Sequence, residues 1–302
     1  MKVSIVVFSP SGNTLRTAAM LREELKKRST AVQLLDLTRN GRLFEAENTQ
    51  SLLEELVDEH EVLCVGGPVY AHHLHYNVLR IISSLPRPFG KWGRIAIPFV
   101  TYGTISSGIS LREAAAALRR SGRITPFAMK AEAFHCMSRL LLTKVGEGLP
   151  DARTMPVIEN LADHIVALEK GRDCSSRIQS FDYQDCASRI KARLIFREKL
   201  WHSRIYPGLT LARGKCKLCS ACIVACPVQR LRIADGALDI AGQPACIHCG
   251  QCVVACPASA ISFNCDFAKW DDRFARAAKG KGLMPSHEKP KSAVYPLRSP
   301  HH

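Results

Sequence analysis

Apolar and polar positions follow two different periods over the first 170 residues. Five short runs rich in Val, Ile and Leu are predicted as buried strands, over residues 2–8, 31–37, 61–66, 94–101 and 124–130. Segments with apolar residues every three or four positions are predicted as helices, over residues 15–27, 49–58, 74–84, 109–121 and 155–170. This order predicts an α/β domain with a doubly wound, five-stranded parallel sheet, whose ligands bind beyond the carboxyl ends of the strands.

The pattern changes in the second part of the chain. Two short alternating runs surround Asp235-Gly236 and predict a small hairpin. Lys, Pro, Ser and His are frequent after Cys265, and we expect this tail to lie loosely on the surface or to be disordered. We therefore expect an α/β domain, a basic helical linker, a small α+β domain and a basic tail, over residues 1–172, 173–206, 207–265 and 266–302.

Eight of the thirteen cysteines occur in two matching phrases of the small domain. Residues 216–227 and 246–257 both read C-x2-C-x2-C-x3-C-P, at an offset of thirty residues. In this spacing the first three thiolates of a phrase bind one 4Fe-4S cluster and the fourth binds the other cluster. The predicted ligand sets are Cys216, Cys219, Cys222 and Cys256 for one cluster, and Cys246, Cys249, Cys252 and Cys226 for the other.

Two other uses of these cysteines are less compatible with the spacing. Cys-x2-Cys pairs also bind zinc, and eight ligands would serve two ions, but zinc ribbons separate their pairs by a dozen or more residues. A disulfide framework needs an oxidising compartment, and nothing in the sequence indicates one. The small domain, over about residues 207–265, resembles the bacterial two-cluster ferredoxin.

The loop after the first predicted strand has the composition of a phosphate site. It reads Ser9-Pro-Ser-Gly-Asn-Thr14 and leads directly into a helix. Backbone N–H groups and hydroxyls at a helix N-terminus satisfy phosphate oxygens, and the helix dipole favours their charge. The loop has neither the P-loop nor the G-x-G-x-x-G spacing. Taken alone, it is also compatible with a simple helix cap.

Two further loops lie at the same predicted edge of the sheet. One is Gly66-Gly-Pro-Val-Tyr-Ala71 and the other is Thr101-Tyr-Gly-Thr104. Together with the first loop they resemble a flavodoxin. The resemblance implies FMN, with its phosphate on the first loop and its isoalloxazine between the other two. The implied binding residues are Ser9, Pro10, Ser11, Gly12, Asn13, Thr14, Pro68, Val69, Tyr70, Ala71, Thr101, Tyr102, Gly103 and Thr104. Pro10 stands where flavodoxins often have Thr.

Each aromatic residue in these loops has a simpler interpretation. Tyr70 or Tyr102 could pack on a helix as an ordinary residue at a strand end. His72, His73 and His75 follow the second loop, where a metal ligand or a cation beside the flavin is one interpretation. We expect surface or packing roles for at least two of the three histidines.

The order of the two domains is similar to a family of flavodoxin–ferredoxin fusion proteins of anaerobic prokaryotes. The resemblance includes Pro-Val-Tyr, Tyr-Gly and the stretch Gly146–Asp151, and it covers about residues 1–265. It implies an electron-transfer protein that passes low-potential electrons between two 4Fe-4S clusters and FMN. The alternative is an FMN-dependent oxidoreductase that reduces a small substrate such as a quinone, in a pocket enclosed by residues 131–150. No triad or acid–base pair is evident, so we predict no catalytic side chain.

The net charge of +15 is unevenly distributed. Residues 1–170 contribute +4, from 21 basic and 17 acidic side chains, and residues 171–302 contribute +11, from 21 and 10. We expect this excess to steer an acidic redox protein, although a solvated basic surface without a partner would have the same composition. No nucleic-acid module accompanies the charge, and aromatic residues make up only 7%. A non-redox protein with degenerate sites is disfavoured by the intact cysteine phrases.

The linker and the remaining cysteines have two interpretations each. Residues 183–204 interleave apolar and basic side chains, which suits a helix packed between the domains or one docked on a partner or a membrane surface. No apolar run is long enough to span a membrane, and Met1 leads straight into a strand, so we expect a reducing cytoplasm. We expect inert thiols at Cys64, Cys136, Cys174, Cys186 and Cys265, although Cys174 and Cys186 could pair.

Overall fold

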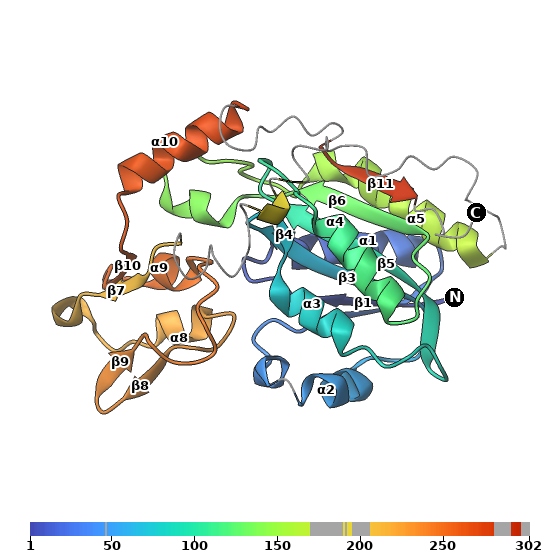
Figure 1. The fold of residues 1–302 in the computed structure, drawn as a ribbon, viewed down its shortest axis with the longest axis horizontal. Helices are drawn as coiled ribbons and strands as arrows, with labels where there is room; N and C mark the ends of the chain where they lie inside the picture. Colours follow the sequence, from blue (N-terminus) through green and yellow to red (C-terminus); the bar gives the residue numbers. More distant parts are fainter. Residues whose placement is uncertain (46, 170–189, 191, 195–205, 281–290, 297–302) are drawn as a thin grey trace.

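The first domain is a three-layer α/β structure (Figure 1). The computed structural model describes residues 1–302 except 46, 170–189, 191, 195–205, 281–290 and 297–302. Its parallel strands are β1 (Lys2–Val7), β2 (Ala31–Asp36), β3 (His60–Tyr70), β5 (Trp92–Tyr102) and β6 (Phe127–Glu132). They lie in the order β2-β1-β3-β5-β6. This is the flavodoxin-like order, and the predicted sheet is confirmed.

Helices cover both faces of this sheet, because the strands carry apolar side chains on both faces. The helices are α1 (Asn13–Lys27), α2 (Thr49–Leu56), α3 (Tyr76–Ser83), α4 (Ser110–Arg120) and α5 (Met155–Glu169). On one face, Val3 and Ile5 of β1 pack with residues of α1 and α5. On the other face, Val6 and the neighbouring strands pack with α3 and α4.

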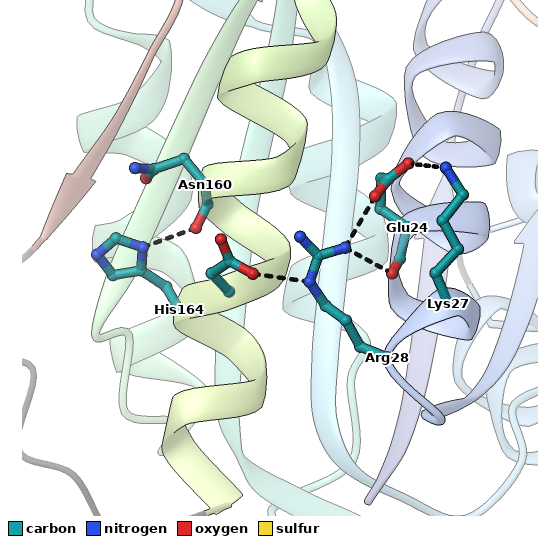
Figure 2. Close-up of polar contacts among 6 residues, drawn as sticks. Glu24, Lys27, Arg28, Asn160 and His164 are labelled. Atoms are coloured by element: carbon teal, nitrogen blue, oxygen red, sulfur yellow. Dashed lines mark hydrogen bonds and ion pairs between the residues drawn. The ribbon is translucent and has the colours of Figure 1, made fainter.

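Helices α1 and α5 are also joined by charge at their solvent edge. Figure 2 shows Arg28, at the end of α1, between Glu24 and α5. Its Nη1 donates to Glu24 Oε2 at 2.8 Å and its Nε donates to Asp163 Oδ1 at 2.7 Å. Hydrogen bonds from Lys27 and Arg28 lower the pKa of the Glu24 carboxyl. The Arg28–Asp163 pair, which links the two helices, has a largely exposed carboxylate and contributes little to stability, so the apolar faces hold the two helices together.

The second domain is small and irregular, and it lies beside the first (Figure 1). The hairpin predicted at Asp235-Gly236 is present as β8 (Arg232–Ala234) and β9 (Ala237–Asp239). Strand β7 (Leu209–Leu211) pairs antiparallel with β10 (Ile261–Phe263). Each cysteine phrase forms a short helix, α8 (Ala221–Ala225) and α9 (Gln251–Ala255).

The expectation of a loose tail after Cys265 was wrong for two segments. Residues Phe267–Ala278 form the amphipathic helix α10, and Ala293–Pro296 form β11, which pairs antiparallel with β6 at the edge of the first sheet. The tail therefore returns from the second domain to the first (Figure 1). A two-residue strand, β4 (His73–Leu74), also pairs with β3. Most of the expected linker, 173–206, lies outside the described residues, and so do Cys174 and Cys186.

The added strand makes a stability prediction. Tyr295 of β11 is 5% exposed, and its ring lies 5.8 Å from the Lys130 ammonium of β6. Replacing it with alanine removes a buried ring, so we expect Tyr295→Ala to lower the free energy of unfolding by roughly 3 kcal/mol in urea titrations. Phe89→Ala, at an 87% exposed position, is the control and should change it by no more than about 0.5 kcal/mol. Equal effects of the two variants would mean that β11 does not stabilise the sheet.

Candidate functional site

The first predicted ligand set surrounds one cavity. Cys216, Cys219, Cys222 and Cys256 all line it, together with apolar residues of the same domain that include Leu238 and Ile261. Four thiols around one cavity are the donor set that a cubane requires. In the described part of the chain, no three His, Cys, Asp or Glu side chains are arranged to hold a single metal ion.

The second predicted set is also drawn together, on the side of the small domain that faces the first domain. Burial, with smaller electrostatic contributions from Cys246 and Cys226, raises the pKa of the Cys252 thiol to about 12. Burial likewise raises the pKa of Cys249 well above its ordinary value. Such thiols stay protonated near pH 7 unless a metal cation binds the sulfur and stabilises the thiolate, as iron in a cluster does. The residues therefore fit the group that the sequence predicts.

The two cysteine phrases have the same backbone. Leu218 and His248 have positive φ angles of 51° and 55°, and the next equivalent pair, Ser220 and Gly250, has 62° and 75°. These turns direct successive thiols inward. Two sulfurs also accept backbone N–H groups, Cys246 from His248 at 3.4 Å and Cys256 from Ala260 at 3.2 Å. Hydrogen bonds of this kind tune the potential of a bound cluster.

The predicted phosphate loop forms a tight turn before α1. Gly12 has a φ of +83°, and a β-carbon added to it would meet nothing within 4 Å. Ser9 Oγ accepts the Leu15 N–H at 2.8 Å, and the Thr14 hydroxyl bonds the Thr101 hydroxyl at 2.7 Å. The hydroxyls therefore shape the loop, while the first turn of α1 leaves N–H groups for an anion. An FMN phosphate fits this donor set.

Both tyrosines of the predicted flavin loops have packing roles. Tyr102 is 2% exposed, and its hydroxyl donates to the Lys291 carbonyl at 2.6 Å. Tyr70 packs edge-on against His75, and its hydroxyl accepts the Cys136 thiol at 3.8 Å. Both are the last residues of their strands, as the packing alternative requires. The backbone of the two loops, rather than an exposed aromatic plane, would contact a ring bound there.

The three histidines after β3 also serve the fold. Burial lowers the pKa of His72 to about 3, so this side chain is neutral near pH 7. His73 contacts Glu113 Oε1 at 2.7 Å, and His75 Nδ1 accepts the Asn77 N–H at the start of α3. Packing and capping therefore account for His72 and His75, and His73 pairs with a carboxylate on α4.

The sequence predicts residues 131–150 only as the enclosure of a substrate pocket, and it does not predict their contacts with the second domain. Residues 133–150, here called the bridging segment, follow β6 and contact both predicted flavin regions. Asn13 donates to the Phe134 carbonyl at 2.7 Å, and Arg139 donates to the Ser11 carbonyl at 2.9 Å. A β-carbon on Gly103 would lie 2.2 Å from the His135 ring, so this ring packs directly on the loop after β5.

The same segment contacts the second domain and its tail. Arg139 also reaches Gln251 Oε1, at 3.5 Å, and Leu140 packs within 4 Å of the position of a Gly250 β-carbon. Both partners belong to the second cysteine phrase. Helix α10 completes the contact, since the Thr143 N–H donates to Asp271 at 2.7 Å and Phe274 packs edge-on against His135.

The tail provides a residue of the site, Lys291, that the local sequence pattern did not predict. Lys291 Nζ donates to the Thr104 carbonyl at 3.1 Å. The neighbouring Ser292 hydroxyl accepts the Glu132 N–H at 3.0 Å. The segment before β11 therefore holds the loop after β5 in place, and it brings a cation to that loop.

Comparison with known proteins identifies the second domain. Residues 215–261 match a family described as a 4Fe-4S dicluster domain. This match covers both cysteine phrases and supports the iron–sulfur interpretation over zinc knuckles. No curated protein matches the whole chain or a part of it.

Several solved structures resemble the chain with low identity. The rubredoxin oxygen:oxidoreductase of Desulfovibrio gigas is 20% identical, with a TM-score of 0.40, over 56% of this chain and 36% of its own length. A flavodoxin from Archaea is 17% identical, with a TM-score of 0.37, over 56% and 99%. An apo NADH:FMN oxidoreductase is 17% identical, with a TM-score of 0.42, over 55% and 89%. The fold assignment rests on the strand order rather than on these likenesses.

The expected architecture is confirmed. A flavodoxin-like domain precedes a 4Fe-4S domain, and this combination is that of an electron-transfer or oxidoreductase protein. No helix among the described residues is long and apolar enough to cross a membrane.

The thiol arrangement predicts how iron content responds to substitution. We expect anaerobically purified protein to contain about eight iron atoms, and Cys219→Ser to retain about four, because it removes a ligand of one cluster. Cys265→Ser, outside both ligand sets, should keep about eight. Iron and sulfide analysis tests this directly. A Cys219→Ser protein with a full iron content would remove Cys219 from the ligand set.

The turn at Gly12 predicts the behaviour of the flavin site. A side chain at φ +83° costs about 1–2 kcal/mol, so Gly12→Ala should weaken FMN binding about tenfold, as measured by quenching of FMN fluorescence. Gly90 also has a positive φ and nothing within 4 Å, but it lies before β5, at the opposite end of that strand from the flavin loop. Gly90→Ala is therefore the matched control, and it should leave the FMN affinity unchanged. Equal losses of FMN affinity in the two variants would mean that general backbone strain, rather than the Gly12 turn, causes the effect.

Proposed function

We propose that this protein carries low-potential electrons between two 4Fe-4S clusters and FMN, and on to a redox partner. When bound, the clusters supply one-electron transfer and FMN supplies one- or two-electron transfer, so the chain can convert single electrons into pairs. The protein residues bind these groups, bury them and fix their separation. Cluster chemistry with reduced thiols suits a cytoplasmic location.

The observation that carries the proposal is the double contact of the bridging segment. Residues 133–150 pack on the predicted phosphate loop and on the second cysteine phrase at once, through Arg139. Tyr70 strengthens the link from another direction. It ends β3 at the predicted flavin loop. Burial raises the pKa of its hydroxyl well above the ordinary value, and electrostatic interactions with Cys136 and then Cys249 add to this. Cys249, a predicted ligand of the second cluster, therefore lies within electrostatic reach of the predicted flavin loop.

The same contact bears on the enzyme alternative. That alternative needs residues 131–150 to enclose a small-substrate pocket over the flavin. Instead, His135 packs on Gly103, and Leu140 and Thr143 contact the second domain and α10. These contacts support an electron carrier in which the second domain, rather than a small molecule, is the neighbour of the flavin site.

The proposal is tested by the kinetics of internal electron transfer. Protein purified without oxygen should contain about one FMN beside about eight iron atoms. After 5-deazariboflavin radical, generated by a light pulse, reduces the clusters by one electron, FMN should be reduced at a rate independent of protein concentration, because donor and acceptor lie in one chain. Iron without flavin, or a rate proportional to protein concentration, would refute the proposal.

Arg139 provides a sharper version of this test. Arg139→Met removes the hydrogen bonds to Ser11 and Gln251, so the rate from cluster to FMN should fall about tenfold, equivalent to about 1.4 kcal/mol. Arg87→Met, at an exposed position outside the site, is the control. If both variants keep the wild-type rate while binding FMN and iron normally, Arg139 does not position the two sites.

A further inference from the structure

The two cysteine phrases share one backbone but differ in exposure. Residues 217–219 of the first phrase are exposed, whereas the equivalent residues 247–249 of the second are buried. The fourth ligands show the matching difference, since Pro227 after Cys226 is buried and Pro257 after Cys256 is exposed. One predicted cluster is therefore enclosed and the other reaches the surface.

The flavodoxin-like domain, the bridging segment and Tyr206 cause this difference. His248 stacks on Tyr206, Gly250 faces Leu140, and Gln251 meets Arg139. The chain after Cys226 also contacts the first domain, where the Arg39 N–H donates to the Pro227 carbonyl at 3.0 Å. In contrast, all the residues that line the cavity of the first set come from positions 216–261, within the small domain itself.

Charge divides between the phrases in the same way. Residues 207–234 contain five Lys or Arg and no Asp or Glu, and residues 240–265 contain none of the four. Arg213, Lys215 and Lys217 are exposed and adjoin Cys216 and Cys219. Leu218 and Ile233 line the cavity and are 42% and 44% exposed. Three exposed cations therefore lie beside the surface cluster and next to two exposed apolar residues. The hairpin that carries Ile233 also bears two carboxylates, Asp235 and Asp239, and Asp239 pairs with Arg232.

We propose that this face, formed by Arg213, Lys215, Lys217, Leu218 and Ile233, is the docking site of an acidic redox protein. The inference rests on the proposed function and gives it a direction. This face is here called the port, the cluster of Cys216, Cys219, Cys222 and Cys256 the outer cluster, and the other the inner cluster. The partner exchanges one electron with the outer cluster, and each electron gained there is lost by the partner. The inner cluster connects the port to the flavin side. A cationic rim steers an anionic protein to the port, and exposed apolar residues supply contact area.

The test measures reduction of the clusters by a reduced acidic ferredoxin. The double variant Lys215→Glu/Lys217→Glu is compared with Arg119→Glu/Arg120→Glu, which changes the charge equally at two exposed positions on α4. We expect the second-order rate to fall at least tenfold for the port variant and less than threefold for the control. Added salt should slow the wild type and narrow the difference. Equal effects of both variants, or no effect of either, would overturn the proposal.

Two further arms separate the alternatives. Photogenerated 5-deazariboflavin radical, a neutral reductant, should reduce the clusters of all three proteins equally. If the radical reduces the port variant more slowly, that variant has a damaged cluster. Lys217→Gln then replaces the port variant in the comparison. A wild-type rate of reduction of Lys217→Gln by the ferredoxin would overturn the proposal. Sedimentation with vesicles containing 30% phosphatidylserine tests whether the face binds a membrane surface instead of a protein. The proposal of a protein partner would be overturned if the wild type binds these vesicles, the port variant does not, and the rate of reduction by the ferredoxin is the same for both.

This experiment is independent of the proposed function. It monitors cluster absorbance only, whereas the proposed function is judged by the later reduction of FMN. Docking can therefore succeed while internal transfer fails, and the two failures are distinguishable.

Discussion

Arg139 donates hydrogen bonds in two directions, to the loop before α1 and to the helix of the second cysteine phrase. The contact between the predicted phosphate loop and the second cysteine phrase runs through this side chain and through the packing of residues 133–150 around it. Electron transfer weakens steeply with distance, so a small domain on a loose tether would exchange electrons only in rare encounters. The bridging segment contacts both regions and is itself packed against α10, so the two regions lie in contact rather than on a loose tether.

The two cysteine phrases share a spacing and a backbone but differ in exposure. Backbone and ligands are the same, and the differences lie in the neighbours and in the charged side chains. A phrase without Lys, Arg, Asp or Glu can be buried without leaving unpaired charges, whereas a phrase that contains Lys217 and directly follows Lys215 has to remain in water. The composition of each repeat is therefore matched to its position relative to the first domain.

Sequence patterns predicted the parts of the structure that rest on local or repeated signals. Apolar runs marked the five parallel strands, and the thirty-residue offset between the cysteine phrases is matched in the structure by similar positive φ angles at Leu218 and His248. Contacts across long stretches of chain left no such signal. The Tyr102 hydroxyl donates a hydrogen bond to the Lys291 carbonyl, 189 residues away, and the sequence around either residue does not predict this contact. The loose tail was expected from its composition, but four residues of β11 suffice to pair with β6 once that edge exists.

Strand β11 follows the cluster ligands in the chain and yet belongs to the sheet that precedes them. A ribosome therefore makes all eight predicted ligand cysteines before it makes the last strand of the first domain. Early folding of that domain during synthesis leaves its β6 edge bare, and Thr104 lacks Lys291 until the later segment arrives. The order of the chain therefore orders synthesis: the cysteine domain is already synthesised when Lys291 and β11, which contact the predicted flavin loop and the β6 edge, are added.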